Sequence, residues 1–287
     1  MKGIILAGGT GSRLAPLTQA FCKQLLPIFD KPMVFYPLSV LMLAGIREIL
    51  IITNGKDKDL ISSLLGDGSD YGIRLGYAVQ KSPDGIAQSF IIGKEFIGKE
   101  NVSLILGDNI FYGEFLNILH EASTLTKGAR IFTNYVDNPS EFAVAEFNES
   151  GKVISIEEKP KNPKSNHAVT GLYFYDNNVV KIAENLSPSK RGELEITDLN
   201  IEYLKKGLLQ ATELGRGFAW LDAGTQKALL EAGEFVHTIE KRQGLKIACL
   251  EEIAFNFGWI NKRTLLNQQR KYINSSYGDY LKKLVLQ

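Results

Sequence analysis

The fold of this 287-residue chain is decided by the stretch Gly3-Ile4-Ile5-Leu6-Ala7-Gly8-Gly9-Thr10-Gly11-Ser12-Arg13. A short apolar run, 3–7, breaks abruptly there into a glycine-rich segment. The apolar run predicts a buried first strand, and the glycines predict a loop after it. Because glycine lets other groups approach the backbone closely, such a loop can present several N–H groups to an anion.

Two familiar nucleotide-binding motifs do not fit this loop. A P-loop ends in Gly-Lys-Ser or Gly-Lys-Thr, and no such tripeptide follows. A dinucleotide fingerprint needs glycine or alanine three places after Gly11, and Leu14 stands there, which disfavours an NAD-binding oxidoreductase. A glycine turn with Arg13 at its end suits a triphosphate, since backbone donors and a guanidinium both bind phosphate. A simple tight turn fits the same pattern equally well.

Outward from this loop, strand and helix patterns alternate over the first ~110 residues, which predicts an open α/β sheet. Helices are expected over 32–44, behind a proline, and over 56–65, and apolar strands over 48–53 and 102–106. The next segments predict strands joined by short turns, so the sheet should be mixed, with some antiparallel pairs: 129–136, 143–147, 153–158 and 169–175. Helices are expected at 195–205, at 225–242 and in a tail from about 251.

The composition excludes several classes of protein. Lys plus Arg is 33 against 32 Asp plus Glu, and this balance gives no sign of a basic face for nucleic acid or membrane. No stretch approaches the ~20 apolar residues of a membrane span, and the N-terminal apolar run is too short for a signal peptide. The two cysteines, Cys22 and Cys249, lack metal-ligand spacing and are expected to be reduced thiols. We therefore expect a cytoplasmic protein.

Two aspartates are candidate metal ligands. Asp108 directly follows the apolar strand 102–106, and ligands of open α/β sheets bind beyond the carboxyl ends of strands. Asp222 lies between an aromatic segment and a glycine. Two carboxylates with phosphate oxygens and water are what Mg²⁺ usually takes. Each aspartate could also be an ordinary turn residue, and their spacing does not show that they converge.

Further charged residues could bind phosphate or sugar. Lys23 lies within ten residues of the glycine loop, and Glu158-Lys159 end an expected strand. Glu158 could accept hydrogen bonds from sugar hydroxyls while Lys159 and Arg191 meet a phosphate, although each could also be a solvated surface residue. The three histidines are scattered and receive no catalytic role.

Taken together, these segments resemble the glucose-1-phosphate thymidylyltransferases from Lys2 to about Tyr280. The stretches that carry the resemblance are 6–14, Lys23-Gln24-Leu25-Leu26-Pro27, Ser82-Pro83-Asp84-Gly85, 106–113 and 192–198. The resemblance implies a Rossmann-like α/β fold with a mixed, mostly parallel sheet flanked by helices, an inserted sugar-binding part and a helical C-terminal tail. It also implies a nucleotidyltransferase core over 1–240 and a C-terminal helical region over 241–287 for subunit contact and effector binding.

The resemblance assigns site residues by matching position. It implies that the catalytic residues are Arg13, Lys23, Asp108, Lys159 and Asp222. Nucleotide binding would involve Gly8, Gly9, Gly11, Arg13, Lys23, Gln24, Gln80, Gly85 and Asp108. Glutamine amides such as Gln24 and Gln80 can donate to and accept from a pyrimidine edge. Sugar-phosphate binding would involve Asn109, Ala143, Glu158, Lys159, Val169 and Arg191, with Trp220 beside Asp222. Asp108 and Asp222 would hold Mg²⁺.

A homotetramer and a feedback site for a downstream dTDP-sugar are further implications of the resemblance. The matching effector positions are Tyr112, Gly113, Arg216, Glu251 and Glu252. Three positions depart from the family pattern: Ala143 replaces a usual glycine, Ala223 replaces a usual threonine, and Glu114 replaces a different polar residue. The changes at Ala143 and Ala223 remove no charged group, so we expect activity to be retained, whereas Glu114 bears on effector binding.

The predicted reaction is Mg²⁺-dependent transfer of a thymidylyl group from dTTP to glucose 1-phosphate, giving dTDP-glucose and pyrophosphate. It would be the first step of dTDP-deoxysugar synthesis, for example of dTDP-rhamnose for surface polysaccharide. The alternatives are the same reaction with another nucleoside triphosphate or sugar 1-phosphate, and a catalytically silent sensor of nucleotide sugars. The complete set of charged residues argues against the sensor.

Overall fold

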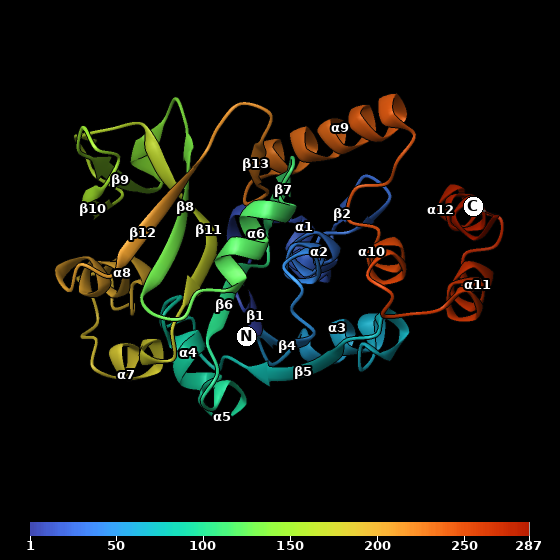
Figure 1. Cartoon of the computed structure of the whole chain (residues 1–287), viewed down its shortest axis with the longest axis horizontal. Coiled ribbons are helices and arrows are strands. Elements are labelled where there is room, and N and C mark those ends of the chain that lie inside the picture. The colour runs from blue at the N-terminus through green and yellow to red at the C-terminus, as the bar shows by residue number, and fades with distance from the viewer. Residues whose placement is uncertain (287) are drawn as a thin grey trace.

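A computed structural model describes residues 1–286 of the chain (Figure 1). The strands are β1 (Lys2–Ala7), β2 (Pro27–Ile28), β3 (Lys31–Pro32), β4 (Glu48–Thr53), β5 (Arg74–Val79), β6 (Val102–Leu106), β7 (Asn109–Tyr112), β8 (Ala129–Tyr135), β9 (Ala143–Phe147), β10 (Val153–Glu158), β11 (His167–Tyr175), β12 (Leu209–Leu214) and β13 (Ala219–Asp222).

Helices cover both faces of the main sheet and form the C-terminal part of the chain (Figure 1). They are α1 (Leu17–Ala20), α2 (Phe35–Leu43), α3 (Lys58–Leu65), α4 (Gln88–Ile92), α5 (Lys94–Ile97), α6 (Leu116–Ser123), α7 (Asn178–Glu184), α8 (Ile196–Lys205), α9 (Gln226–Gln243), α10 (Leu250–Asn256), α11 (Lys262–Lys271) and α12 (Ser276–Leu286). Short 3-10 turns are η1 (Ser12–Leu14), η2 (Lys23–Leu25), η3 (Ser69–Tyr71) and η4 (Pro139–Glu141).

The main sheet has a parallel half and an antiparallel half, whose one parallel pair within the described residues is β8–β12. Strands β5, β4, β1 and β6 are parallel neighbours, and β11 then pairs antiparallel with β6. Beyond β11 the sheet divides: β8 and β12 continue along one part of this strand, and β9 and β10 along another. A register shift between Val169 and Tyr173 accompanies this division. The α/β class, the mixed sheet flanked by helices and the helical C-terminal tail are thus confirmed.

The parallel strands are apolar throughout because both of their faces are covered. In β1, Ile4 belongs to the core under α4, α7 and α8, whereas its neighbour Ile5 belongs to the core shared by α2 and the C-terminal helices. Both residues are fully buried. This double covering leaves the ends of the strands as the places where polar groups can reach solvent or a ligand.

The helix expected over 32–44 begins later than predicted. Pro32 pairs with Pro27 in the small β2–β3 hairpin, and α2 starts at Phe35. The boundaries of helix α9 differ by one residue at each end from the predicted range 225–242, because local capping defines both ends. Thr225 accepts a hydrogen bond from the N–H of Ala228 at 3.2 Å, and a left-handed glycine, Gly244, ends the helix.

Candidate active site

The glycine-rich loop and Asp108 lie at the same edge of the sheet. Strands β1 and β6 pair in parallel with Ile5 opposite Ile105, so their carboxyl ends emerge side by side. The N–H of Gly107, just after β6, donates to the carbonyl of Leu6 at 2.9 Å. The two segments that the sequence singled out for phosphate and metal therefore adjoin, as expected for ligand sites of open α/β sheets.

The loop itself needs glycine at position 11. Gly11 has φ of 64°, and a Cβ there would lie 2.8 Å from the side chain of Thr18. The exposed Arg13 follows in η1. A Cβ at Gly224 would come within 2.9 Å of the Arg13 guanidinium and 3.1 Å of Asp222, so both charged groups lie around this glycine. The loop thus places a cation beside a candidate metal ligand.

Two buried glutamines lie next to the loop. Gln24 is 3% exposed and Gln80 is 5% exposed. A Cβ at Gly8 would lie 2.5 Å from Oε1 of Gln80, so only glycine lets this amide approach the loop so closely. Gln80 Nε2 donates to the carbonyl of Gly85 at 3.2 Å. Gly85 packs its Cα against the backbone of Leu194, where no Cβ fits, and this contact joins the 82–85 loop to the segment before α8.

The other glutamine, Gln24, is held by a thiol. Cys22 Sγ donates to Gln24 Oε1 at 3.3 Å. Burial raises the pKa of this thiol to about 12, so the thiol stays protonated and remains a donor. With Oε1 accepting this bond, the Nε2 group of Gln24 is the part of the amide that can donate to a ligand.

Asp108 is held through both of its carboxylate oxygens. Lys23 Nζ bonds one oxygen, and Asn109 Nδ2 donates to the other at 3.1 Å. Burial opposes ionisation of Asp108, but the adjacent Lys23 ammonium holds the pKa of this carboxyl below its usual range. Lys23 is itself only 9% exposed. The lysine is therefore part of the carboxylate site.

A two-stranded ribbon brings Asp222 to Asp108. Strand β13 pairs antiparallel with β7, and Asp222 lies opposite Asn109. The N–H of Ala223 also donates to the carbonyl of Asp108 at 3.0 Å. Burial and the neighbouring Asp108 charge raise the pKa of Asp222 above its usual range. Two carboxylates from distant parts of the sequence thus share one buried place.

The donor set at this place fits Mg²⁺. Within residues 1–286, Asp222 Oδ1 is buried and has no hydrogen-bond partner. No cluster of three or more His, Cys, Asp or Glu residues with metal-binding geometry occurs in the same range. Mg²⁺ characteristically uses one or two carboxylates and takes its remaining ligands from substrate phosphates and water. A pair of acidic residues at an open edge, one oxygen of which is unpartnered, matches that requirement.

The antiparallel half of the sheet supplies the candidate sugar-phosphate residues. Ala143, the first residue of β9, pairs with Glu158, the last residue of β10. Glu158 accepts a hydrogen bond from the hydroxyl of Thr197 at 2.5 Å. The next residue, Lys159, has φ of 44°, and its N–H donates to the carbonyl of Phe142 at 3.0 Å. A left-handed backbone is strained for lysine and is often found at functional positions.

Arg191 is surrounded by carboxylates. Its guanidinium lies 2.9 Å from Glu193, 3.2 Å from Glu195 and 3.8 Å from Glu158. The arginine side chain is 44% exposed, so a phosphate could reach it from solvent. Val169 is buried in β11, next to the same part of the sheet. Glu158, Lys159 and Arg191 therefore come from two segments that the fold brings together.

Comparison with known proteins agrees with this arrangement. Residues 2–239 match the protein-family model for nucleotidyl transferases. A glucose-1-phosphate thymidylyltransferase of Neisseria meningitidis is 58% identical over 286 residues, which cover 99% of each chain. The corresponding protein of Xanthomonas campestris is 54% identical, with 99% of this chain and 96% of that protein covered. The chain belongs to the nucleotidyl transferase family.

A crystal structure from Bacillus anthracis, described as a glucose-1-phosphate thymidylyltransferase in complex with a sucrose, shares the fold of this nucleotidyltransferase. The TM-score is 0.77 at 43% sequence identity, and the match covers 82% of this chain and 94% of that chain. The curated relatives are enzymes by name. The hypothesis of a catalytically silent sensor is therefore set aside.

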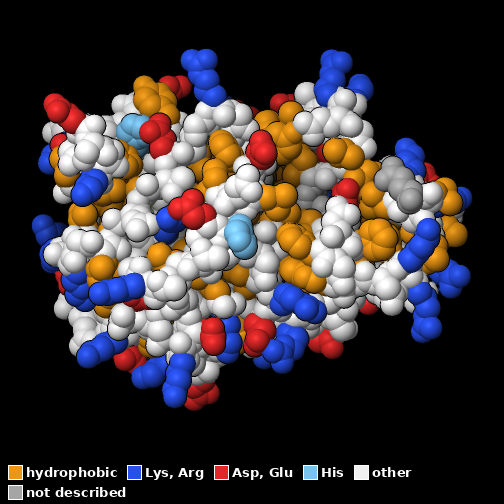
Figure 2. Space-filling model, viewed as in Figure 1, with side chains coloured by type: hydrophobic (Ala, Val, Ile, Leu, Met, Phe, Trp, Pro, Cys, Tyr) orange, Lys and Arg blue, Asp and Glu red, His pale blue; other side chains and the backbone are white. Residues whose placement is uncertain are grey.

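Two of the residues matched to an effector site line a separate cavity. Tyr112 and Gly113 border a hollow of about 190 Å³ together with α2, α6 and the segment 243–248. Figure 2 shows hydrophobic side chains gathered on this face, where α6 and α2 approach the C-terminal helices. Arg216 is exposed in the loop between β12 and β13.

The two acidic effector candidates lie on α10 and are held by tyrosines of α12. Glu251 is fully buried and accepts a hydrogen bond from Tyr277 at 2.5 Å. Glu252 accepts one from Tyr280 at 2.8 Å. Within the described part of the chain, neither glutamate lines the 190 Å³ cavity. These contacts tie the C-terminal helices together, and the effector roles of all five residues stay predictions.

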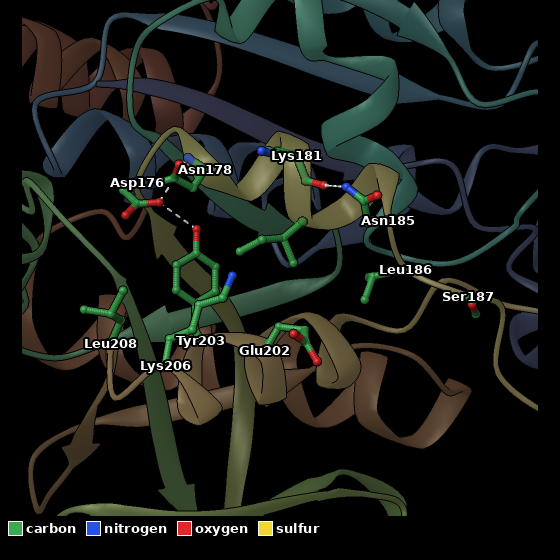
Figure 3. Close-up of a pocket in the computed structure, with 11 residues that line it drawn as sticks. Asp176, Asn178, Lys181, Asn185, Leu186, Ser187, Glu202, Tyr203, Lys206 and Leu208 are labelled. Atoms are coloured by element: carbon green, nitrogen blue, oxygen red, sulfur yellow. Dashed lines mark hydrogen bonds between the residues drawn. The ribbon is translucent and has the colours of Figure 1, made fainter.

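A further cavity, of about 550 Å³, lies between α7 and α8 at the opposite end of the sheet (Figure 3). Asp176, at the end of β11, forms part of its wall. Since β11 runs antiparallel to β6 with Tyr175 opposite Val102, this place adjoins the start of β6, whereas Asp108 follows the end of the same strand. The cavity is therefore distinct from the candidate active site.

Sequence reasoning missed several residues that support the site. Gln88 accepts a hydrogen bond from Gln80 at 2.7 Å and donates to Asp84 at 2.8 Å. Thr197 holds Glu158, as described above. Both residues lie in or beside stretches that carried the family resemblance. A signal was therefore present, but only the folded chain shows what these side chains contact.

Proposed function

We propose that this enzyme transfers the thymidylyl group of dTTP to glucose 1-phosphate, with Mg²⁺, and releases pyrophosphate. The observation that carries the proposal is the junction of the glycine loop, the buried glutamine amides and the Asp108–Asp222 pair at one edge of the sheet. The names of the relatives supply the substrates. The product, dTDP-glucose, would enter dTDP-deoxysugar synthesis, such as that of dTDP-rhamnose.

The reaction would be an in-line displacement at the α-phosphorus of dTTP. A phosphate oxygen of glucose 1-phosphate forms the new bond to phosphorus, and the bond to the bridging oxygen breaks, so that pyrophosphate leaves. The nucleophile is already largely dianionic at neutral pH, because the second pKa of a phosphate monoester is about 6. No general base is then needed. Catalysis becomes positioning and charge neutralisation, as in other phosphoryl transfers.

In this proposal, different residues bind the triphosphate, the base, the sugar phosphate and the metal ion. The loop N–H groups of Gly8, Gly9 and Gly11 hold the triphosphate, and Arg13 and Lys23 neutralise the departing pyrophosphate. The amides of Gln24 and Gln80 read the pyrimidine, with Gly85 alongside. Lys159 and Arg191 draw in the second anion, and Glu158 binds sugar hydroxyls with Asn109, Ala143 and Val169 nearby. Asp108 and Asp222 would hold Mg²⁺, which when bound supplies positive charge to the phosphate oxygens.

We also propose the assembly and the location of the enzyme. Residues 241–287, beyond the end of the family match at 239, would serve subunit contact in a homotetramer and form part of a feedback site for a dTDP-sugar. A cytoplasmic location is supported by two buried cysteines that remain free thiols. Within residues 1–286, no helix has the length and hydropathy needed to cross a membrane.

The proposal is tested by pyrophosphate release with Mg²⁺ and glucose 1-phosphate, comparing dTTP, UTP, ATP, CTP and GTP. We expect dTTP to be fastest and the purine nucleotides and CTP to be clearly slower. A survey of other sugar 1-phosphates with dTTP then tests glucose. Faster release with another triphosphate would move the proposal to that nucleotide, and no release with any would refute it.

A further inference from the structure

The side chain of Asn109, beside the carboxylate pair, makes hydrogen bonds through both the oxygen and the nitrogen of its amide. It is 2% exposed. Its Oδ1 accepts hydrogen bonds from Trp220 Nε1 at 2.6 Å and from the N–H of Gly171 at 3.0 Å. Its Nδ2 donates to Asp108 at 3.1 Å. Three different strands, β7, β11 and β13, thus meet on one amide.

These bonds fix which way the amide faces. Two N–H donors converge on the same atom, and that atom must be the oxygen, since an amide NH₂ cannot accept from them. The NH₂ group is therefore directed at Asp108. Gly171 is required for this arrangement, because a Cβ there would lie 2.5 Å from Asn109 Oδ1. The side chain amide of Asn109 is thus held at both its oxygen and its nitrogen.

We propose that Asn109 is a positioning residue that sets the orientation of the Asp108 carboxylate for the metal ion. This inference rests on the proposed function only for the identity of the ion. Asp108 is gripped by Lys23 on one oxygen and by Asn109 on the other, so the plane of the carboxylate is defined before a ligand arrives. Outer partners of metal ligands act in this way, and their loss commonly costs 10- to 100-fold in metal affinity or activity.

Trp220 is the element that anchors the amide. Its indole N–H bonds Asn109, and its ring lies 5.1 Å from the ring of Phe142, whose carbonyl accepts from the N–H of Lys159. The tryptophan therefore has a polar edge toward the carboxylates and an apolar face toward the sugar side. Replacement by phenylalanine removes the donor and retains an aromatic ring.

The direct test measures Mg²⁺ binding rather than turnover. The chain contains two tryptophans, so Trp259→Phe leaves Trp220 as a single fluorescent reporter. Mg²⁺ is titrated into this variant with dTTP present and glucose 1-phosphate absent. We expect a saturable change in Trp220 emission, and we expect Asn109→Ala to raise the midpoint about tenfold or more. Trp220→Phe, followed by calorimetry in place of fluorescence, should raise it by a smaller factor.

Asn101→Ala is the matched control, since Asn101 precedes β6 as Asn109 follows it. Its side chain donates to the carbonyl of Leu125 at 2.6 Å and accepts from the N–H of Asn177 at 3.1 Å, far from the carboxylates. We expect it to lower thermal stability without moving the Mg²⁺ midpoint. If Asn109→Ala leaves the midpoint unchanged and raises the KM for glucose 1-phosphate, Asn109 binds sugar and the inference is wrong.

The inference and the proposed function fail separately. A shifted midpoint in Asn109→Ala together with no pyrophosphate release from any triphosphate would support the positioning role and reject the substrates. If Asn109→Ala does not fold, Trp220→Phe decides, because it removes one donor and leaves the asparagine in place. An unchanged midpoint in that variant would overturn the inference.

Discussion

Acidic residues lie near both ends of the main sheet, Asp176 at one end and the pair Asp108 and Asp222 at the other, and the two ends differ in how completely those acids are bonded. At one end, Asp176 is 3% exposed, and its carboxylate accepts hydrogen bonds from Gly128 at 2.7 Å, Asn178 at 3.0 Å and the Tyr203 hydroxyl at 2.7 Å (Figure 3). At the other end, Asp222 keeps a buried oxygen with no partner in the described part of the chain.

The difference separates a structural acid from a candidate ligand. Leaving a buried polar atom without a partner costs about 1–3 kcal/mol, so such an atom is unlike the rest of a folded core. Both carboxylate oxygens of Asp176 accept hydrogen bonds from protein groups, whereas one carboxylate oxygen of Asp222 is left for a cation. The cavity beside Asp176, of about 550 Å³, falls within the size range of ligand sites, but the Asp176 carboxylate on its wall is bonded to protein groups.

The largest expected effect comes from Asp108→Asn, which keeps the shape and removes the charge. If the pair holds Mg²⁺, turnover should fall on the order of 10³-fold, since metal stabilisation of phosphoryl transfer is worth several kcal/mol. Pyrophosphate release at saturating Mg²⁺ measures this, and circular dichroism checks the fold. A near-normal rate would show that Asp108 does not bind the metal ion, and Asp108 and Asp176 would then not differ in function.

A smaller effect is expected at the sugar side, from Arg191→Ala. Hydrogen bonds between charged groups contribute about 1.5–3 kcal/mol, so the KM for glucose 1-phosphate should rise about 10- to 100-fold while the KM for dTTP changes little. Lys190→Ala is the matched control, because it removes a neighbouring positive charge that makes no ion pair within residues 1–286. Equal increases of the KM in the two variants would indicate that Arg191 acts through its positive charge at a distance and not through a direct contact with the phosphate.

Asp176→Asn tests the structural end of the comparison. An amide has one acceptor oxygen in place of two, so at least one of the three donors loses its partner and stability should drop by about 1–3 kcal/mol. Denaturant unfolding measures the loss. Turnover per folded molecule should stay within about twofold, and a drop comparable to that of Asp108→Asn would show that both ends serve catalysis.

The smallest effect is expected from Ala143→Gly, which restores the residue usual in the resembling family. Ala143 lies at the start of β9, and glycine in a strand costs roughly 0.5–1 kcal/mol of stability. We expect kcat/KM for glucose 1-phosphate to change by less than about threefold, measured by pyrophosphate release. A larger gain would mean that the methyl group narrows the sugar pocket.

The sequence predicted most of the parallel half of the sheet. The strands 48–53 and 102–106 have the boundaries expected from their apolar runs, and β1 differs by one residue. Such strands are covered on both faces, so a continuous run of apolar residues is enough to predict them. The strands that were missed include β5 of the parallel half, β12 and the β2–β3 hairpin. Two further missed strands, β7 and β13, are short and carry mixed residues, because each belongs to a partly exposed two-stranded ribbon.

The β7–β13 ribbon also explains why the sequence identified the site residues but did not show that they lie together. Asp108 and Asp222 were identified from their neighbours, whereas their meeting depends on the pairing of Asn109 with Asp222. Likewise Lys23 was placed near phosphate, and its bond to Asp108 depends on the turn η2 beneath the sheet edge. Long-range register is a property of the folded chain, and no local pattern encodes it.

The buried thiol of Cys22, which bonds Gln24, is expected to have low chemical reactivity. Burial raises the pKa of the Cys22 thiol to about 12, so the side chain is almost entirely protonated at pH 7. Alkylating agents and peroxides attack the thiolate, so we expect this cysteine to be nearly inert toward them despite its contact with Gln24. If Gln24 reads the base as proposed, we expect treatment with peroxide to leave the nucleotide selectivity unchanged, because the thiol that bonds Gln24 is buried and protonated.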